Sequence, residues 1–487
     1  MPSHWLKTKR HLAWTLAACG LVGGVLCPPT AAQPATRPGG AEATRPGYTV
    51  RRYNEDWSSL ANVQRHRTDD RWDPIKYVSL GEDTGSYASF GGQYRLRIEA
   101  WDNFGFSDAN DDTFVLNRFQ LHSDVHLNDR LRVFVQGKSA VSTDRDLPGG
   151  KRALDVDSLA LQQAFVDVEL SLGDDATLTL RPGRQEILFG KQRLVSPLPW
   201  ANTRRTWDGV SAILETGEWE TTGFWSQFAP VQKYDFNDPD RQTQFFGIYA
   251  SGPLTEQGQV NADVYYLGLD RQDAQTFNGT SGEEQRHTFG ARLFGDIGDT
   301  GLDYDIEAAY QTGEVGAGDV SAFMVGGELG YSFDEASGAP RAFVGFDYGS
   351  GDDTPGGDVE TFNQLFPLGH AYLGYIDAIG RQNIIDFTPG LTVQPMPELT
   401  LKAQGHFFWR ASRNDAVYNA GGGVLRGPGG SDDRFVGSEI DLLGKYQFNR
   451  HTSVVLGYSR FFPGGFIDET GPSDDINFVY TMFNYKF

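Results

Sequence analysis

Basic and apolar residues alternate in several segments of this chain, in a pattern that could bring cationic side chains onto one surface. In residues 94–98, Arg95 and Arg97 lie between Tyr94, Leu96 and Ile98. Successive side chains of a β-strand point to opposite faces, so such a strand would carry its arginines on one face and its apolar residues on the other. An arginine guanidinium donates parallel hydrogen bonds to a carboxylate and stays charged. The chemistry that this spacing favours is therefore the binding of anions.

The same alternation assigns further basic side chains to the face opposite the apolar residues. They are Arg118, Arg132, Lys138, Arg292, Lys402, His406 and Arg410. Residues 181–207 hold a second concentration of basic residues beside two tryptophans. Its members are Arg184, Lys191, Arg193, Trp200, Arg204, Arg205 and Trp207. Aromatic rings next to guanidinium groups could hold sugar rings and uronate carboxylates. The alternative is that such cations pair with acids such as Glu99 and Asp124, and only brace a wall.

The alternation continues to the last residue and predicts strands throughout. In the final segment, Val479, Thr481, Phe483, Tyr485 and Phe487 fall on one side. A terminal aromatic on a strand with one apolar face is typical of outer-membrane β-barrels. Residues 86–487 accommodate about 18 strands of membrane-spanning length with their connections. The sequence therefore predicts an all-β fold, a transmembrane antiparallel β-barrel, whose even strand number would place both termini in the periplasm.

Short turns and long polar loops alternate between the predicted strands, as expected when hairpins have a periplasmic end and an outer end. The short turns are predicted at residues 128–129, 173–175, 298–299, 395–397 and 449–450. The long loops are predicted at residues 103–113, 143–157, 190–206, 270–285, 351–381, 412–433 and 462–474. The 351–381 loop is rich in aromatic and aliphatic residues. We expect it to fold over or into the lumen as a constriction or gate.

The N-terminal region has the pattern of a secretory signal. Residues 1–32 have a basic start, an apolar stretch and small residues at the expected cleavage site before Gln33. An alternative processing site is a lipoprotein box that ends in Cys19. Residues 33–85 are expected to form a flexible N-terminal segment, the later part of which could lie in the periplasm or enter the barrel mouth. Residues 86–487 are expected to form the barrel.

Composition narrows the classes of partner and chemistry. The only cysteines, Cys19 and Cys27, lie in the signal region, so neither disulfides nor thiolate metal sites are expected in the mature chain. We expect no metal, no cofactor and no catalytic residues, because the histidines are scattered and no acid–base cluster stands out. Taken alone, the net charge of −22 argues against an anionic partner, nucleic acid included, but the location of the charges matters more than their sum. Many of the acids fall in the predicted loops, where we expect them to be solvated surface charges; the alternative is that divalent cations bridge them to anionic lipid.

Several stretches together resemble the alginate export family of outer-membrane barrels. They are residues 73–80 (DPIKYVSL) with 90–99 (FGGQYRLRIE), 183–186 (GRQE) with 190–194 (GKQRL) and 207–209 (WDG), 362–367 (FNQLFP) with 369–377 (GHAYLGYID), 406–410 (HFFWR), and 437–442 (GSEIDL). Their order and spacing carry the resemblance, which extends over residues 50–487.

The resemblance implies a monomeric barrel of about 18 strands that passes an anionic exopolysaccharide through an arginine-lined constriction. It would place in that constriction Arg95, Arg97, Arg184, Arg193 and Arg410. The chain departs from the family pattern in its penultimate strand, where Val455 and Gly457 stand at positions that look arginine-rich in alginate exporters. The resemblance therefore does not identify the polymer.

Together these observations predict a non-enzymatic channel in the cell outer membrane for an anionic exopolysaccharide, such as an alginate-like polyuronate. The alternative is an anion- or oligosaccharide-selective uptake porin, since both functions need a basic lumen. A secreted β-rich enzyme, such as a polysaccharide lyase, would leave the terminal aromatic unexplained. The expected partners are the polysaccharide, outer-membrane lipid and lipopolysaccharide, and a periplasmic export scaffold.

Overall fold

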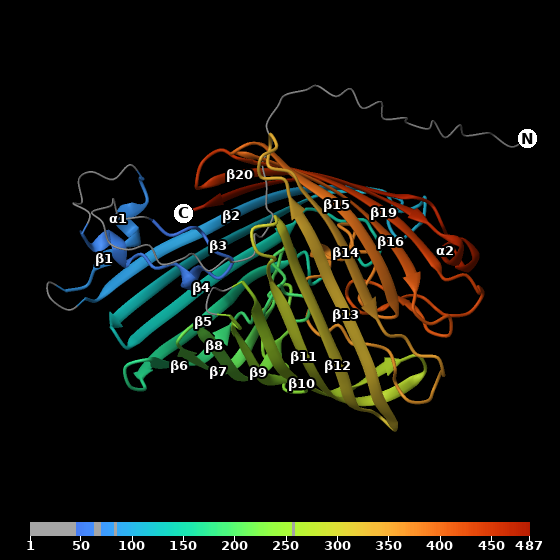
Figure 1. Ribbon diagram of the computed structural model, residues 1–487, viewed down its shortest axis with the longest axis horizontal. Helices are drawn as coiled ribbons and strands as arrows, with labels where there is room; N and C mark the ends of the chain where they lie inside the picture. The colour runs from blue at the N-terminus through green and yellow to red at the C-terminus, as the bar shows by residue number, and fades with distance from the viewer. Residues whose placement is uncertain (1–44, 63–69, 82–84, 256–258) are drawn as a thin grey trace, which may run out of the picture.

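The computed structural model describes residues 45–62, 70–81, 85–255 and 259–487. The expected signal peptide and the alternative site at Cys19 lie outside the described residues. Within the described residues, the strands wrap around a common axis as one barrel (Figure 1).

The barrel wall has 18 antiparallel strands, as the sequence predicts. The first nine are β2 (Tyr87–Asp102), β3 (Asp112–Asn128), β4 (Leu131–Ser142), β5 (Asp157–Ser171), β6 (Ala176–Gln185), β7 (Thr206–Thr216), β8 (Trp219–Ala229), β9 (Thr243–Pro253) and β10 (Asn261–Phe277). The other nine are β11 (Thr280–Asp296), β12 (Leu302–Val315), β13 (Gly318–Ser332), β14 (Arg341–Gly349), β15 (Ile384–Met396), β16 (Leu399–Arg410), β19 (Phe435–Gln447), β20 (Thr452–Pro463) and β21 (Ile476–Lys486). Each strand pairs with the next, and β2 pairs with β21 from Gln93–Lys486 to Asp102–Asn477, which closes the barrel.

Several short elements lie outside the wall. They are β1 (Val78–Ser79), the hairpin of β17 (Val417–Tyr418) and β18 (Val424–Arg426), the 3₁₀ turns η1 (Arg52–Asn54), η2 (Ser58–Asn62) and η3 (Gly369–Ala371), and the helices α1 (Asp73–Lys76) and α2 (Gly465–Thr470). Among the described residues, no helix has the length and the apolar content that a membrane span requires.

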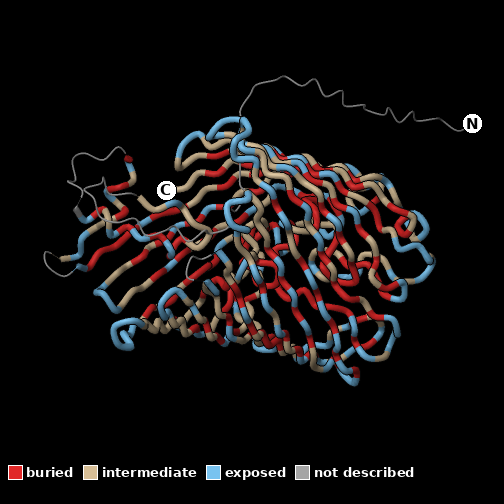
Figure 2. Tube along the Cα trace, viewed as in Figure 1, coloured by how far each residue is buried: buried red, intermediate tan, exposed pale blue. Residues whose placement is uncertain are grey.

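Buried and exposed residues alternate along the wall strands (Figure 2). In β3, for example, Leu121 is 48% exposed whereas the neighbouring Gln120 and His122 are 3% and 5% exposed. The outer face is dominated by aliphatic and aromatic side chains, and the inner face carries most of the buried polar groups. This confirms the assignment of faces by alternation, because a two-residue period is a property of the extended backbone.

The long connections gather at one end of the barrel. They are 103–111, 143–156, 186–205, 230–242, 350–383, 411–434 and 464–475, and the two-residue turns 278–279 and 316–317 lie at the same end, whereas the other end has turns such as 129–130, 217–218 and 397–398. The predicted loop at 270–285 is wrong, since β10 and β11 pair through it and turn at Asn278-Gly279. Both turn residues have positive φ, at 41° and 94°, which Asn-Gly adopts readily in a two-residue hairpin.

The two ends of the described chain meet at the short-turn end. Helix α1 and the C-terminus lie together at the left of Figure 1, and α2 lies at the other end. Phe487 exchanges backbone hydrogen bonds with Gly92 of β2. The position of this end in the periplasm stays a prediction.

Candidate functional site

Two long connections, 186–205 and 350–383, fold into the barrel and fill its middle. Val195 and Phe366 form a parallel bridge between them, with Ser196 N donating to Phe366 O at 2.9 Å. Phe366 packs against Phe245 and Trp207 of the inner wall. This confirms that the apolar 351–381 loop folds into the interior; its role as a constriction or gate stays a prediction.

Two arginines of the inner wall bind the backbone of connection 186–205. Arg95 donates to Pro199 O at 2.9 Å and to Ala201 O at 2.8 Å. Arg118 on the adjacent strand donates to the same two carbonyl oxygens, at 3.2 and 3.0 Å. Among the described residues, neither guanidinium forms an ion pair with a carboxylate. Their positive charges therefore face carbonyl dipoles and one another.

Arg205 is bound in the same way, within the connections themselves. Its guanidinium donates to Pro367 O at 2.8 Å, which joins connection 186–205 to connection 350–383. Burial lowers the pKa of Arg205 to about 10, because desolvation disfavours the charged form. It has no carboxylate partner within the described part of the chain. Arg95, Arg118 and Arg205 are called the carbonyl-bound arginines below.

Arg97 begins a stacked column that crosses the interior. It pairs with Glu99 at 2.7 Å, and its guanidinium lies 3.9 Å from the centroid of the Trp200 ring. The opposite face of Trp200 stacks on His370 with centroids 3.7 Å apart, and His370 stacks on Tyr375 at 4.8 Å. The column ties β2 to both inserted connections through aromatic and cation–π contacts.

Most other predicted pore-lining cations are neutralised by acids of the inner face. The pairs are Arg132–Asp124 (2.6 Å), Lys138–Asp157 (2.8 Å), Arg193–Asp305 (2.8 Å), Arg204–Glu186 (2.6 Å), Arg292–Asp263 (2.7 Å) and His406–Asp386 (2.8 Å). The acids were expected mainly in the outer loops, yet many of them line the interior. A charge buried without a partner is costly, so interior cations and acids occur together.

Lys402 and Arg410 also lie on the inner face, without an ion pair to a described carboxylate. Lys402 Nζ lies 5.2 Å from the centroid of Phe343 and 5.8 Å from that of Tyr375. Arg410 is fully buried at the long-loop end, over the ring of Phe466 in α2, and it donates to carbonyl oxygens of residues 413–433. It holds connection 411–434 in place rather than facing open space.

Arg184 differs from the expectation, since it lies on the outer face of the barrel. Arg184 and Pro182 are two residues apart in β6 and therefore lie on the same face. Their partners in β7 are Asp208 and the exposed Val210, which shows that this face points outward. Arg184 Nε donates to Asp208 at 2.6 Å. Its assignment to the interior came from local charge density and the family resemblance. The residue alternation of β6 places it outside, near the long-loop end.

The sequence did not single out several buried residues that join the inserted connections to the wall. Arg381 donates to Asp347 of β14 at 3.0 Å and to Arg193 O at 3.0 Å. Glu439 of β19 accepts the backbone N–H of Ile376 at 2.9 Å. These partners are far apart in the sequence, and no local pattern indicates that they meet.

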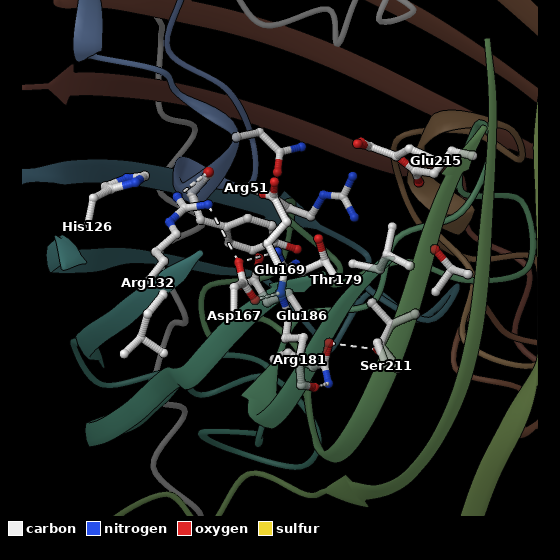
Figure 3. A pocket seen from close by; sticks show the side chains of 18 of the residues that line it. Arg51, His126, Arg132, Asp167, Glu169, Thr179, Arg181, Glu186, Ser211 and Glu215 are labelled. Atoms are coloured by element: carbon white, nitrogen blue, oxygen red, sulfur yellow. Dashed lines mark hydrogen bonds and ion pairs between the residues drawn. The ribbon is translucent and has the colours of Figure 1, made fainter. Parts of the chain in front are cut away.

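A cavity of about 290 Å³ lies inside the barrel toward the short-turn end (Figure 3). Arg132 and Arg181 reach into it, and both pair with Asp167; Arg181 and Asp167 are 2.6 Å apart. Glu169 and Glu215 line it as well. The cavity therefore carries both signs of charge, unlike the region of the carbonyl-bound arginines.

Comparison with solved structures shows the fold at low sequence identity. Acinetobacter baumannii OccAB1 is 12% identical with a TM-score of 0.56, over 85% of this chain and 99% of that one. Pseudomonas aeruginosa OpdO is 14% identical with a TM-score of 0.54, over 85% and 98%. Pseudomonas aeruginosa OccK2 (OpdF), solved in complex with glucuronate, is 12% identical with a TM-score of 0.54, over 82% and 98%. No curated protein matches the chain.

The family comparison is more specific. Residues 86–480 match the family described as alginate export, and this range contains nearly the whole barrel. The match and the porin-like fold place the protein in the outer membrane. The chain belongs to the alginate export family.

Proposed function

We propose that this barrel conducts an anionic polysaccharide, of polyuronate type, across the outer membrane. The observation that carries the proposal is the set of carbonyl-bound arginines, which lie in the interior without an acidic partner among the described residues. Membership of a polysaccharide export family supports a channel rather than an enzyme.

The carbonyl oxygens of residues 199, 201 and 367 occupy the positions where substrate carboxylates would bind. A carboxylate makes a stronger, charge-assisted hydrogen bond with a guanidinium than a neutral carbonyl does. When connections 186–205 and 350–383 move aside, Arg95 and Arg118 would present two adjacent forks to a polymer that carries one carboxylate per sugar. Trp200 would then offer a ring face for stacking on sugar.

An uptake channel for small anions or oligosaccharides is the second candidate. It is favoured by the likeness in fold to OccAB1 and to OccK2 (OpdF), the latter solved with glucuronate. Both candidates use the same arginines. They differ in whether a long polymer enters the lumen, so a comparison of polymer with monosaccharide separates them.

The proposal extends to the orientation of the barrel, its contacts with lipopolysaccharide and its oligomeric state. The short-turn end, with both ends of the described chain, would face the periplasm and receive polymer from an export scaffold. The outer acidic loops would meet lipopolysaccharide, and the barrel would act as a monomer.

The test is ion selectivity in planar bilayers, measured as reversal potential in a salt gradient. The variant is Arg95→Gln with Arg118→Gln, tested together and singly, and the control for each single change is Arg184→Gln, which removes one positive charge from the outer face. Wild type and control should prefer chloride, and the double variant should lose that preference several-fold, because these two charges have no acidic partner.

Blockade completes the test. Polyuronate added on the short-turn side should block wild-type current more than a neutral glucan does, and the double variant should be blocked less. Equal blockade by glucuronate monomer and by polymer would favour the uptake function. Cation selectivity of the wild type would contradict both candidates.

A further inference from the structure

The described N-terminal residues 45–62 and 70–79 cover the junction between the first and last wall strands; we call them the N-terminal clasp. At this junction Gly92 N donates to Phe487 O at 2.8 Å, and Phe487 N donates to Gly92 O at 3.0 Å. This mutual pair ends the ladder between β2 and β21, the strands whose pairing closes the barrel.

Arg52 of the clasp bonds to both strands of the junction with one guanidinium. Its Nη1 donates to Gly92 O and its Nη2 donates to Phe487 O, both at 2.9 Å. The third nitrogen of the guanidinium, Nε, donates to Glu55 Oε1 at 2.6 Å. The Arg52 side chain is buried, with 6% of the residue exposed. The two backbone oxygens fit one planar fork only while β2 and β21 are paired.

The clasp also packs on the side chains that end β21. The ring of Trp72 stacks on Phe487 with centroids 4.3 Å apart and an angle of 26°. Trp72 Nε1 donates to the hydroxyl of Tyr485 at 2.7 Å, and Arg71 donates to the same oxygen. The aromatic end of the last strand is therefore covered by the clasp.

The turn between β19 and β20 completes the contact. The two ring nitrogens of His451 lie 2.8 Å from Lys486 O and 2.9 Å from Asp70 Oδ2. Glycine at the junction leaves room for this packing. A Cβ on Gly91 would lie 2.5 Å from Lys76 Nζ and 2.6 Å from Phe487 O, so a larger residue would require the Lys76 side chain and the backbone of Phe487 to shift.

We propose that the N-terminal clasp is a seam-closing element. It docks after β2 and β21 have paired, because Arg52 needs one backbone oxygen from Gly92 of β2 and one from Phe487, which follows β21. Once docked, it resists separation of these strands, whose unpaired edges would otherwise expose a row of backbone donors and acceptors. It also packs against the partly buried aromatic residues Tyr485 and Phe487 at the end of β21, so docking marks the finished barrel.

Heat-modifiability in gels measures the seam directly, as the temperature at which half of the folded barrel converts to the unfolded band. The variants are Arg52→Ala and Trp72→Ala, with Arg130→Ala as the matched control on an exposed turn of the same end. Arg52→Ala and Trp72→Ala should each lower the half-conversion temperature by roughly 5 °C, and the control should not. Trp72→Phe should restore most of the loss, since it keeps the stacked ring.

A disulfide across the seam tests whether the clasp acts through strand closure. Ile98 and Thr481 are directly paired and point outward. The Ile98–Thr481 pair lies six positions along the ladder from Gly92–Phe487 and is therefore, like it, a hydrogen-bonded pair. Such pairs have a Cα separation of about 5.5 Å, which suits a disulfide. In the oxidised Ile98→Cys, Thr481→Cys barrel, Arg52→Ala and Trp72→Ala should no longer lower the half-conversion temperature, and reduction should restore their effect. An undiminished loss in the locked barrel, or a loss no larger than that of Arg130→Ala, would overturn the proposal.

Discussion

Individual cations inside this barrel are satisfied in two chemically different ways. Arg292 and Arg193 share Asp305 and are held by short ion pairs. Arg95 and Arg118 have only neutral oxygens from connection 186–205. Breaking a buried ion pair costs about 3–5 kcal/mol, because it leaves an uncompensated charge. The paired arginines are thus fixed parts of the wall, whereas under the proposed function the carbonyl-bound ones would exchange their carbonyl partners for an entering anion.

Lys76 in α1 is a third case, a buried amine with no hydrogen-bond partner among the described residues. Its Nζ lies 4.8 Å from the centroid of Trp57, and burial lowers its pKa from 10.5 to about 7. Between those values the unfolded chain binds a proton that the folded clasp does not, so the free energy of unfolding rises with pH in this window. The clasp should therefore dock more weakly at pH 6 than at pH 9.

Lys76→Met should remove this pH dependence. Protease cleavage within residues 45–62, followed at pH 6, 7.5 and 9, measures docking. Wild type should be cleaved faster at low pH, Lys76→Met should be cleaved at a nearly constant rate, and Lys151→Met in an outer loop should behave as wild type. An equal pH response in Lys76→Met would contradict the assignment.

At the scale of elements, the connection 350–383 is held at both of its ends. Near its start, Thr280 donates to Gly357 O at 2.7 Å, and Val359 bridges to Val320, so the tips of two hairpins hold it. Near its end, Asn383 N donates to Ser350 O at 3.2 Å, which brings the two ends of the connection together. Because Ser350 and Asn383 are hydrogen-bonded to each other, residues between them can be removed without stretching the wall.

Removing residues 355–378 should raise single-channel conductance in planar bilayers. The segment packs inside the barrel, so its loss should widen the path if it forms the predicted constriction. Shortening the exposed turn between β13 and β14, by removing Glu335 and Ala336, is the control and should leave conductance unchanged. Unaltered conductance after the larger deletion would show that the connection lies outside the permeation path.

At the scale of the whole molecule, the barrel is a single closed sheet with one seam between strands distant in sequence. Every other pair of neighbouring wall strands is joined by a connection of the chain itself, whereas β2 and β21 meet only by folding. The chain carries a net charge of −22, but much of its interior charge is balanced in pairs. We therefore expect the ion selectivity of the channel to depend on a few unbalanced residues and not on the total charge.

Deleting Phe487 should reduce the amount of protein in the outer membrane and leave unfolded chain in the periplasm. The insertion machinery is expected to bind the aromatic end of the last strand, and Phe487→Trp should preserve that step. Trp72→Ala keeps Phe487, so it should insert normally and lose only thermal resistance. Normal amounts of heat-modifiable barrel after the deletion would argue against this role of Phe487.

The sequence by itself determined the wall. A two-residue period is built into extended backbone, so alternation assigned Arg95, Arg118 and Lys402 to the inner face without knowledge of their neighbours. Turn residues placed most hairpins, and the aromatic content of the 351–381 loop indicated its burial. The prediction of a loop at 270–285 is wrong because β10 and β11 extend past the apolar part of the wall, where their residues are polar. The two strands are joined by the Asn278-Gly279 turn.

Only the tertiary structure decided which partner each interior charge has. Arg95 meets Pro199 O, Arg381 meets Asp347, and Arg52 meets Phe487 O, and no local pattern records these contacts. Alternation along β6 places Arg184 on the outer face, whereas the density of charge around it predicts that it lines the pore. The structure agrees with the alternation. Period and turn chemistry act between adjacent residues, whereas pairing inside a barrel depends on where distant connections fold.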